Sequence, residues 1–558
     1  MPHLSALRPW QQALLVALVF VLLSVAATWP AATDPAHLSV VRPTENDYRF
    51  NLFLVFWGAH ALLNEPLNIH HTNMFHPERY TYVYADVLLA HSLLMLPVIE
   101  AFYNPILTYN VFLILSLTIN GTGFFLLARS VTGHAGAALF GAVCWAFNPA
   151  YFPRYQQIQL FGVHWLPWLA WALWHWLSPR DQQPDQARSS RWAVATTVFF
   201  CLNALSGSHI AVFGGMLAAS MIIYFTVARG LWRDRRFVGG TIAMTVVIVA
   251  LLAPVLWPYL PLEQVMAAKR GETLNISNSS LRPLEFFSAG SHFYRWLDAR
   301  FGWPSVLGGG REPETYGFPG IVTLALALVG MVWPAGKRRA DRNFWVLCAA
   351  LFVSLALGVY GTYPLLGKLP VLRLIRVPTR FMLPAVFCLA VLASFGVAKL
   401  VERIVNRNAR VALFSGLALL FAVEASHAPL PTFPYDNAPQ PLEQFLAEQP
   451  GAFAIVEFPL EPRSVSINAR QVFTSIFHWK KILVGYSGWQ SDENLRLVAG
   501  IRDRFPSDEC LDDLVRLDVR FVIVRRDRLE TSFLEAVARQ PRLRPALVID
   551  ETVVYRLQ

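Results

Sequence analysis

The dominant pattern along the chain is a succession of long apolar runs separated by short polar loops. A helix that crosses a bilayer needs about 20 apolar residues, and somewhat shorter runs cross where the helix tilts or the bilayer thins. The pattern therefore predicts a mainly α, polytopic transmembrane bundle of about eleven spans. The predicted spans are Trp10–Trp29, Ile106–Ala128, Ala135–Ala150, Phe161–Leu177, Trp192–Ser206, Ile210–Ala228, Phe237–Trp257, Phe318–Trp333, Phe344–Val359, Phe381–Leu400 and Val411–Ala425.

The segment Val83–Phe102 is apolar enough to span but carries Asp86, His91 and Glu100. Counting it as a span reverses the orientation of every later loop, so the loop charges decide. When it lies at the surface, the basic clusters all fall on the side of the N-terminus, as the positive-inside rule requires. We therefore predict an interfacial or re-entrant segment. The clusters are Arg129; Arg180, Arg188 and Arg191; Arg229, Arg233, Arg235 and Arg236; Lys337, Arg338, Arg339 and Arg342; and Arg403, Arg407 and Arg410.

The same orientation places three polar regions outside: Pro30–Pro105, Tyr259–Thr315 and everything after His427. In the first, Asp47–Asn64 has apolar residues at helical spacing but is too short to cross. We expect this helix to lie flat in the membrane interface, with its aromatic face in lipid or against the bundle. An ordinary packing role is the simplest interpretation of that aromatic face. That face consists of Phe50, Phe53, Leu54, Trp57 and Ala61.

The composition changes at Tyr435 from almost wholly apolar to mixed and charged, over a length sufficient for one small core. We predict a transmembrane domain at residues 1–430 and a small external α/β domain at residues 435–558. Its expected strands are Ala454–Phe458, Val519–Val524 and Ala546–Leu557, and its expected helices are Pro441–Glu448 and Leu529–Arg539.

Composition supports the membrane assignment. The 558 residues are 55% hydrophobic and only 15% charged, with a mean hydropathy of +0.40, which excludes an ordinary soluble protein. The net charge of +10 comes mostly from short loops, so it marks orientation rather than nucleic-acid binding. Four of the five cysteines lie in apolar runs and suggest no disulfide. The first run has no convincing cleavage pattern and is interpreted as a retained signal anchor.

The first external loop carries two carboxylates, Glu45 and Asp47, just ahead of the predicted interfacial helix. In an extended segment, residues two apart point to the same side, so the pair would face one bound group. A structural interpretation has equal local support, because Thr44 and Asp47 have the spacing of a helix capping box.

Four cations in the loop Gly367–Arg380 break the charge pattern, because the positive-inside rule gives external cations no role. They are Lys368, Arg373, Arg376 and Arg380. Guanidinium groups suit phosphate oxygens, so we predict a site for a lipid phosphate or pyrophosphate, with headgroup contact or snorkelling as the alternative. Arg154, in another short external loop with Gln156, Gln157 and Gln159, is placed to contact a polar headgroup or water.

Other polar residues carry weaker signals. His70, His71 and His76, with Asp86 and His91, match no closed zinc pattern. The external segment Ser288–Tyr316 offers His292, Glu312, Glu314 and a glycine run that no strand precedes, so it is not a phosphate-binding loop. Apart from Glu424, the spans hold almost no ionisable residue at midplane, which disfavours a transporter.

Together these features resemble the C-type glycosyltransferase superfamily, and most closely its bacterial YfhO-like and polyprenyl-phosphate-mannose-type mannosyltransferase-like members. The short matching patches are Phe75-His76-Pro77, Tyr109-Asn110, Pro149 to Arg154 with Gln159, Glu314 to Gly317, Arg376 to Phe381, Val456 to Leu460 and Val484 to Gly488. Where relatives often open the first loop with Gly-Asp, this chain has Glu45-Asn46-Asp47, so either carboxylate fits the family role.

The resemblance implies an integral-membrane enzyme that moves a hexose or pentose from a polyprenyl-phosphate donor to an extracytoplasmic glycan, lipid or protein, with inversion. It implies a bacterial inner-membrane location with a cytoplasmic N-terminus. A lipid-linked saccharide translocator or a non-catalytic scaffold is the alternative. The resemblance implies that Asp47 and Glu45 act as a base or as metal ligands, with Mg²⁺ or Mn²⁺ as the candidate metal. It implies phosphate binding by five cations: Arg376, Arg380, Arg373, Lys368 and Arg154. It implies substrate contacts for His76, His292, Glu314 and Gln159.

Overall fold

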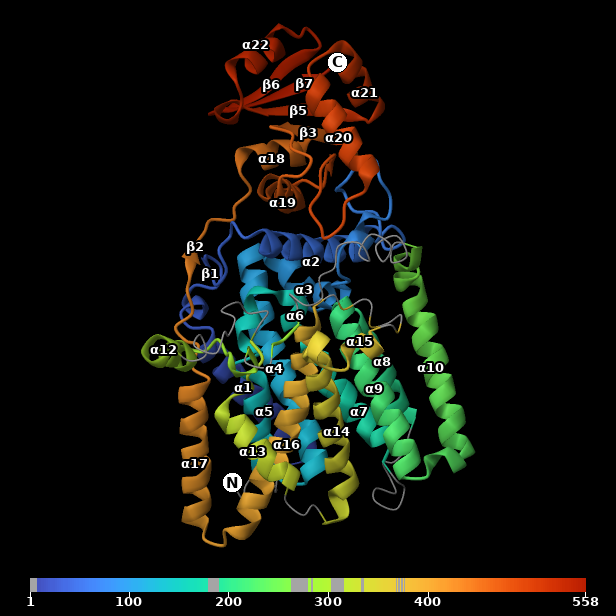
Figure 1. Cartoon of the computed structure of the whole chain (residues 1–558). Helices are drawn as coiled ribbons and strands as arrows, with labels where there is room; N and C mark the ends of the chain where they lie inside the picture. Colours follow the sequence, from blue (N-terminus) through green and yellow to red (C-terminus); the bar gives the residue numbers. More distant parts are fainter. Residues whose placement is uncertain are drawn as a thin grey trace. The chain divides into compact units, whose positions relative to one another are not determined.

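The structure is a computed structural model that describes residues 8–178, 190–261, 280–282, 285–302, 316–332, 336–367, 369, 372, 375 and 377–558. The chain forms two compact units (Figure 1). The helical unit comprises Met1–Asp34 and Asn110–Pro431, and the tail unit comprises Pro35–Tyr109 and Thr432–Gln558. The second boundary falls beside the predicted break at 430–435, whereas Pro35–Tyr109, expected in domain 1–430, belongs to the tail unit.

A helix forms within each predicted span. In the hydrocarbon core of a membrane an apolar run is stable only when its backbone N–H and C=O groups are paired, and a helix pairs them within the run. Five helices in the described residues are long and apolar enough to cross a membrane: α1, α4, α9, α10 and α16. The count of about eleven spans stays a prediction. The helices are α1 Pro9–Ala27, α4 Pro105–Thr132, α5 Ala135–Ala146, α6 Ile158–Phe161, α7 Leu166–Trp176, α8 Ser190–Ala204, α9 Ser208–Ala228, α10 Arg235–Leu256, α12 His292–Phe301, α13 Ile321–Val332, α14 Arg339–Ala356, α15 Tyr363–Leu366, α16 Met382–Arg403 and α17 Arg407–Glu424.

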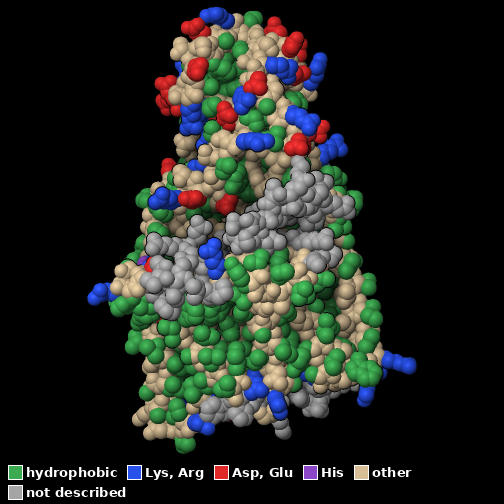
Figure 2. Space-filling view, in the orientation of Figure 1, with side chains coloured by type: hydrophobic (Ala, Val, Ile, Leu, Met, Phe, Trp, Pro, Cys, Tyr) green, Lys and Arg blue, Asp and Glu red, His purple; other side chains and the backbone are tan. Residues whose placement is uncertain are grey.

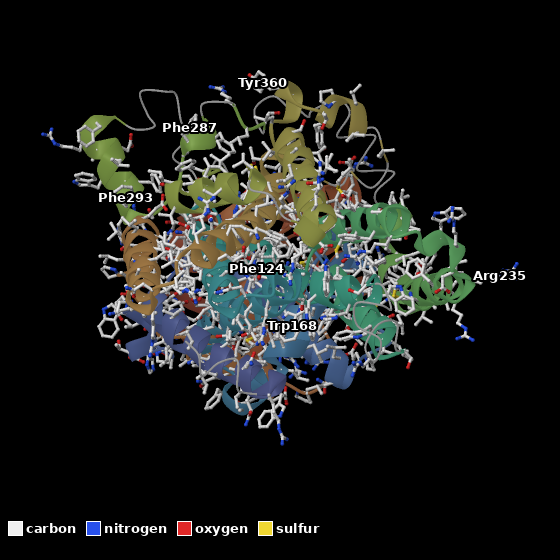
Figure 3. The ribbon with its side chains drawn as sticks, turned by 90° about the horizontal axis from the view of Figure 1, so that it is seen from below. Phe124, Trp168, Arg235, Phe287, Phe293 and Tyr360 are labelled. Carbon is white, nitrogen blue, oxygen red and sulfur yellow. The ribbon has the colours of Figure 1, made fainter. Side chains whose placement is uncertain are left out.

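Helix α16 forms the centre of the helical unit, with α5, α13 and α14 packed against it. Phe124 of α4 lies in the middle of the bundle, stacked near Trp145 and edge-on to Phe387 of α16, whereas Arg235 lies at the margin (Figure 3). On the face that Figure 2 shows, hydrophobic side chains outnumber charged ones on the bundle, while charged side chains of both signs are spread over the tail unit. A surface of this kind is suited to lipid.

The contact between α13 and α16 depends on glycine. A Cβ at Gly330 would lie 2.1 Å from the carbonyl oxygen of Leu392, and a Cβ at Gly396 would lie 2.1 Å from that of Leu326. The backbones therefore meet directly, as small residues permit between helices in lipid.

Glu424, the acidic exception among the predicted spans, is a structural residue. Its buried carboxylate accepts hydrogen bonds from the backbone N–H groups of Ile321 and Val322 and from the hydroxyl of Tyr294. It thereby caps the N-terminus of α13, where backbone donors lack helical partners. Gly320 has a φ of +93°, and a Cβ there would lie 3.0 Å from the Glu424 carboxylate, so glycine fits both requirements.

The tail unit contains a five-stranded sheet in the order β4-β3-β5-β7-β6, with β3 parallel to β4 and β5 and with β7 antiparallel to β5 and β6. The expected single strand Ala546–Leu557 is instead the hairpin of β6 and β7, because Asp550 adopts a left-handed conformation at the turn. The elements are β1 Leu38–Ser39, α2 Asn46–Asn64, α3 Leu89–Phe102, β2 Phe433–Pro434, α18 Pro441–Glu448, β3 Ala454–Phe458, α19 Val465–Thr474, β4 Lys481–Ile482, α20 Asp492–Arg504, α21 Asp508–Arg516, β5 Val519–Arg525, α22 Thr531–Arg539, β6 Leu543–Ile549 and β7 Thr552–Leu557.

Helix α2 confirms the predicted helix and the packing role of its aromatic face. That face is buried against protein rather than exposed to lipid, because α2 packs on α3 and α19. Trp57 and His60, for example, both contact the ring of Trp479. Helix α3 has 14 residues with Pro97 inside, so its length of about 21 Å falls short of the ~30 Å hydrocarbon core. Its interfacial or re-entrant position stays a prediction.

The glycine contact predicts that Gly396→Ala destabilises the helical unit by about 1–3 kcal/mol, because the new methyl group forces α13 and α16 apart. Gly416→Ala in α17 is the matched control, since no atom lies within 4 Å of its Cβ position and alanine is favoured over glycine by up to about 1 kcal/mol in a helix. Thermal unfolding of the two variants in the same detergent measures the difference. Equal melting temperatures would contradict the close-packed contact.

Candidate functional site

The two carboxylates of the first loop lie at the start of α2. Glu45 is the N-cap residue with φ −65° and ψ 129°, and its side chain makes no capping hydrogen bond. Asp47 lies in the first helical turn, and both side chains are exposed. The capping box of Thr44 with Asp47 is therefore wrong, and so is the extended geometry that would aim both carboxylates at one group. Their position at a helix N-terminus favours negative charge.

Asp47 has one hydrogen-bond donor from the far end of the chain. The hydroxyl of Tyr486 donates to Asp47 Oδ1 at 2.7 Å. The ring of Phe50, one turn along α2, meets the Tyr486 ring edge-on at 5.2 Å. Burial, followed by the contact with Asp47, raises the pKa of Tyr486, so the phenol keeps its proton and remains a donor. The sequence placed Tyr486 in a family-like patch without indicating this role.

The loop that carries Tyr486 is fixed by an addition to the sheet edge. The backbone of Asn73 and His76 pairs with Ile482 of the edge strand β4, with N–O distances of 2.8 and 2.9 Å, and Phe75 N–H donates to Val484 at 3.0 Å. Pairing of this kind covers an otherwise open edge. Gly485 then lies against the Phe75 ring, where a Cβ would come within 2.4 Å of it. The first loop and the tail are thus one folded unit.

His76 has a structural contact here, and its predicted substrate contact stays a prediction. Its Nε2 donates to the carbonyl oxygen of Leu517 at 2.9 Å. Burial lowers the pKa of His76, and the neutral ring with a proton on Nε2 satisfies this bond. The ring therefore fixes the first loop to the tail.

In the helical unit, Arg380 pairs with a histidine that the sequence analysis missed. Arg380 lies in the 3₁₀ turn Pro378–Phe381, and its Nη1 donates to His209 Nε2 at 2.8 Å, with both side chains more than nine-tenths buried. His209 is the second residue of α9. Gly207, the N-cap residue of this helix, has a φ of 145° and lies beside the carbonyl oxygen of Gln159. Three groups therefore lie together at the N-terminus of α9: the backbone carbonyl of Gln159 and the side chains of His209 and Arg380.

Arg154 is also buried, with 1% of its surface exposed, in the 3₁₀ turn Phe152–Gln156 that packs on α6. A buried guanidinium is stable only when it is paired or hydrogen-bonded, and it binds oxyanions more strongly than an exposed one. The predicted role of Arg154 and Arg380 as phosphate ligands stays a prediction. The other predicted phosphate ligands, Lys368, Arg373 and Arg376, lie outside the described residues, as does Glu314.

His292 begins α12, an amphipathic helix at the end of α17. Its backbone N–H donates to Ser426 at 2.8 Å, and its Nδ1 accepts from the Arg295 guanidinium at 2.8 Å. Phe293, the next residue, is drawn at the margin of the unit in Figure 3. The structure therefore gives His292 contacts with Ser426, just past the end of α17, and within α12, and its predicted substrate contact stays a prediction.

No group of three or more histidine, cysteine, aspartate or glutamate side chains is arranged to hold a metal in the part of the chain that the structure describes. Glu45 and Asp47 would supply two carboxylates, and a hard divalent cation takes about six oxygen ligands. The described donor set alone therefore does not complete a Mg²⁺ or Mn²⁺ site, and metal dependence stays a prediction.

Solved structures define the class of fold. The chain is similar to the arabinofuranosyltransferase AftD from Mycobacteria, with a TM-score of 0.52 and 16% identity over 98% of this chain and 40% of that chain. The chain shares the fold of this membrane glycosyltransferase, and with its apolar helices it is a multi-pass membrane protein. It spans less than half the length of AftD.

Two more distant similarities involve the oligosaccharyltransferase of Archaeoglobus fulgidus and ArnT from Cupriavidus metallidurans bound to undecaprenyl phosphate. The first has a TM-score of 0.48 and 11% identity over 94% of this chain and 71% of that one, and the second has 0.44 and 13% over 98% and 97%. No curated protein matches the sequence. Residues 21–423 match the family described as "Domain of unknown function (DUF6311)", and the chain belongs to this family.

The packing of Gly485 on Phe75 predicts that Gly485→Ala destabilises the tail unit by about 1–3 kcal/mol, because the methyl group cannot fit without moving the ring. Gly488→Ala, three residues along the same loop, is the matched control, since nothing lies within 4 Å of its Cβ position. Thermal unfolding and limited proteolysis compare the two. A Gly485→Ala protein as stable as the Gly488→Ala protein would contradict the described packing.

Proposed function

We propose that this protein is a glycosyltransferase of the bacterial inner membrane, which transfers a sugar from a polyprenyl-phosphate donor to an acceptor hydroxyl outside the cytoplasm. The N-terminus is cytoplasmic and the tail unit is extracytoplasmic. The observation that supports this most is an exposed, hydrogen-bonded carboxylate, Asp47, at the start of α2 in a chain with a C-type glycosyltransferase fold. Buried arginines in the helical unit supply the complementary feature for a phosphate.

Asp47 acts as the general base. The acceptor oxygen forms a bond to the anomeric carbon while the bond from that carbon to the phosphate oxygen breaks, and the polyprenyl phosphate leaves with the electron pair. Asp47 takes the proton of the acceptor hydroxyl. Direct displacement inverts the anomeric configuration, as in the inverting glycoside hydrolases, where a carboxylate activates water in the same way.

Arg380 and Arg154 bind the donor phosphate. Its negative charge increases as the glycosidic bond breaks, so a desolvated guanidinium stabilises the transition state more than the ground state. The phosphate is already a good leaving group, and with that charge neutralised it needs no separate acid. Arg373, Arg376 and Lys368 are proposed to share this role. Glu45, His292, Glu314 and Gln159 are proposed to contact the acceptor or the donor sugar.

The donor sugar is found by giving the purified protein in nanodiscs a panel of undecaprenyl-phosphate hexoses and pentoses with a lipid extract of bacterial envelope, and measuring released undecaprenyl phosphate by mass spectrometry. Release with transfer of sugar to the extract supports the enzyme. Binding of undecaprenyl phosphate without release from any donor would favour the translocator or scaffold instead.

Asp47→Asn is expected to lower the transfer rate by about 10²–10⁴-fold, the usual contribution of a general base, because the amide cannot take the proton. Donor binding and melting temperature are expected to stay close to wild type. Glu45→Gln is the matched control, with the same loss of a carboxylate two residues away, and is expected to have a much smaller effect. Wild-type turnover in the Asp47→Asn protein would transfer the role to another carboxylate.

Arg380→Ala is expected to weaken binding of undecaprenyl phosphate by about 10- to 150-fold, equivalent to about 1.5–3 kcal/mol for a charge-assisted hydrogen bond. Arg403→Ala, which removes an exposed arginine from the other end of α16, controls for the loss of charge. Binding is measured by native mass spectrometry, with thermal unfolding as a check on folding. Equal affinities in the two variants would exclude Arg380 from the phosphate site.

A further inference from the structure

Asp47 receives its hydrogen bond from a residue 439 positions away along the chain, Tyr486. Both belong to the tail unit, so this contact lies within one compact body. Tyr486 is half-buried and stays protonated, and its hydroxyl contacts Oδ1 of the carboxylate.

Tyr486 is held firmly enough to orient a partner. Its ring meets Phe50 edge-on, which fixes the ring relative to the first turns of α2. The preceding residues are fixed by the sheet-edge pairing of Phe75 with Val484 and of Asn73 and His76 with Ile482. The close fit of Gly485 on the Phe75 ring removes further freedom. A donor on such a support restricts the rotation of the Asp47 side chain.

We propose that Tyr486 is a positioning residue, through which the tail completes the catalytic site by orienting the carboxylate of Asp47 toward the acceptor hydroxyl. The proposal rests on the proposed function of Asp47. Its consequence is that the C-terminal segment is required for the rate of transfer and not only for stability. A neutral phenol suits the role, because it orients a carboxylate without neutralising it.

The first arm of the test needs no substrate. Melting temperatures are measured for the wild type, Asp47→Ala, Tyr486→Phe and the double variant, because alanine removes the acceptor whereas asparagine would keep one. If the hydroxyl bonds to the carboxylate, Tyr486→Phe lowers the melting temperature in the wild-type background and has little further effect in the Asp47→Ala background, because coupled residues are not additive. Additive shifts would overturn the contact and the proposal.

The second arm uses the undecaprenyl-phosphate sugar that the wild-type protein turns over. Tyr486→Phe is expected to lower kcat by about 10- to 100-fold, the scale of a base misplaced by about 1 Å, while KM for the donor stays within about twofold. Tyr103→Phe is the matched control: it removes a hydroxyl that also joins the first loop to the tail, at the carbonyl of Ile476, but does not contact Asp47.

The outcomes separate the two proposals. A lower kcat in Tyr486→Phe but not in Tyr103→Phe, with coupled melting temperatures, supports the positioning role. An unchanged kcat in Tyr486→Phe while Asp47→Asn is inactive overturns the positioning role and leaves the proposed function intact. Full activity of Asp47→Asn, or no turnover of any donor by the wild type, overturns both.

Discussion

The pairing of the first loop with the edge strand β4 is the constraint on which the acidic site depends. Residues 73–76 reach a strand about 400 positions later in the chain, and the backbone bonds to Ile482 and Val484 satisfy groups that are buried there. Buried N–H and C=O groups must be paired, so this register is strongly preferred over a free loop. The register brings the start of α2 and the Tyr486 loop together, and with them Asp47 and its donor.

The helical unit follows a different rule, because apolar side chains alone do not distinguish one helix contact from another in lipid. Its specific contacts come from glycines, which let two helix backbones meet, and from a buried carboxylate whose oxygens accept hydrogen bonds. Gly330 and Gly396 let two backbones touch, and Glu424 ties α12, α13 and α17 together through the hydroxyl of Tyr294 and two amides. These few contacts select one arrangement among many apolar ones.

Most of the fold could be predicted from the sequence, because the period and length of apolar runs report directly on helices and strands. Helices formed in every predicted span, and β3 and β5 lie where their apolar runs predicted them. The predictions that failed concern features set by the conformation of a single residue or by a partner far away in the sequence. Asp550 in a left-handed turn divides the last strand into a hairpin, and helix α2 begins one residue after Glu45, so the proposed capping box does not form.

The candidate site divides in the same way. Each candidate charge had a local signal: Asp47 belongs to a carboxylate pair in the first external loop, Arg154 lies in a short external loop, and Arg380 is an external cation that orientation does not explain. His209, 171 residues from Arg380, and Tyr486, 439 residues from Asp47, had no such signal, because no local pattern reports a contact between distant segments. The sequence singled out His76 as a polar residue of the first loop. It did not show that the ring binds the carbonyl of Leu517, because that residue lies in the tail.

The environments of the proposed base and of the proposed phosphate ligands differ in the way that these roles require. A base that takes a proton from a water-borne acceptor has to be reached from solvent, and Asp47 is exposed. An arginine or lysine as its neighbour would lower the pKa of a carboxylate by about 1–3 units and weaken it as a base, whereas a phenol orients it at a smaller cost. Phosphate ligands need the reverse, because a guanidinium binds an anion most strongly away from water. Arg380 and Arg154 are correspondingly buried. Under the proposed function, the exposed carboxylate held by a neutral donor serves as the base and the buried cations serve as phosphate ligands, whereas a translocator that only carries a phosphate has no use for the base.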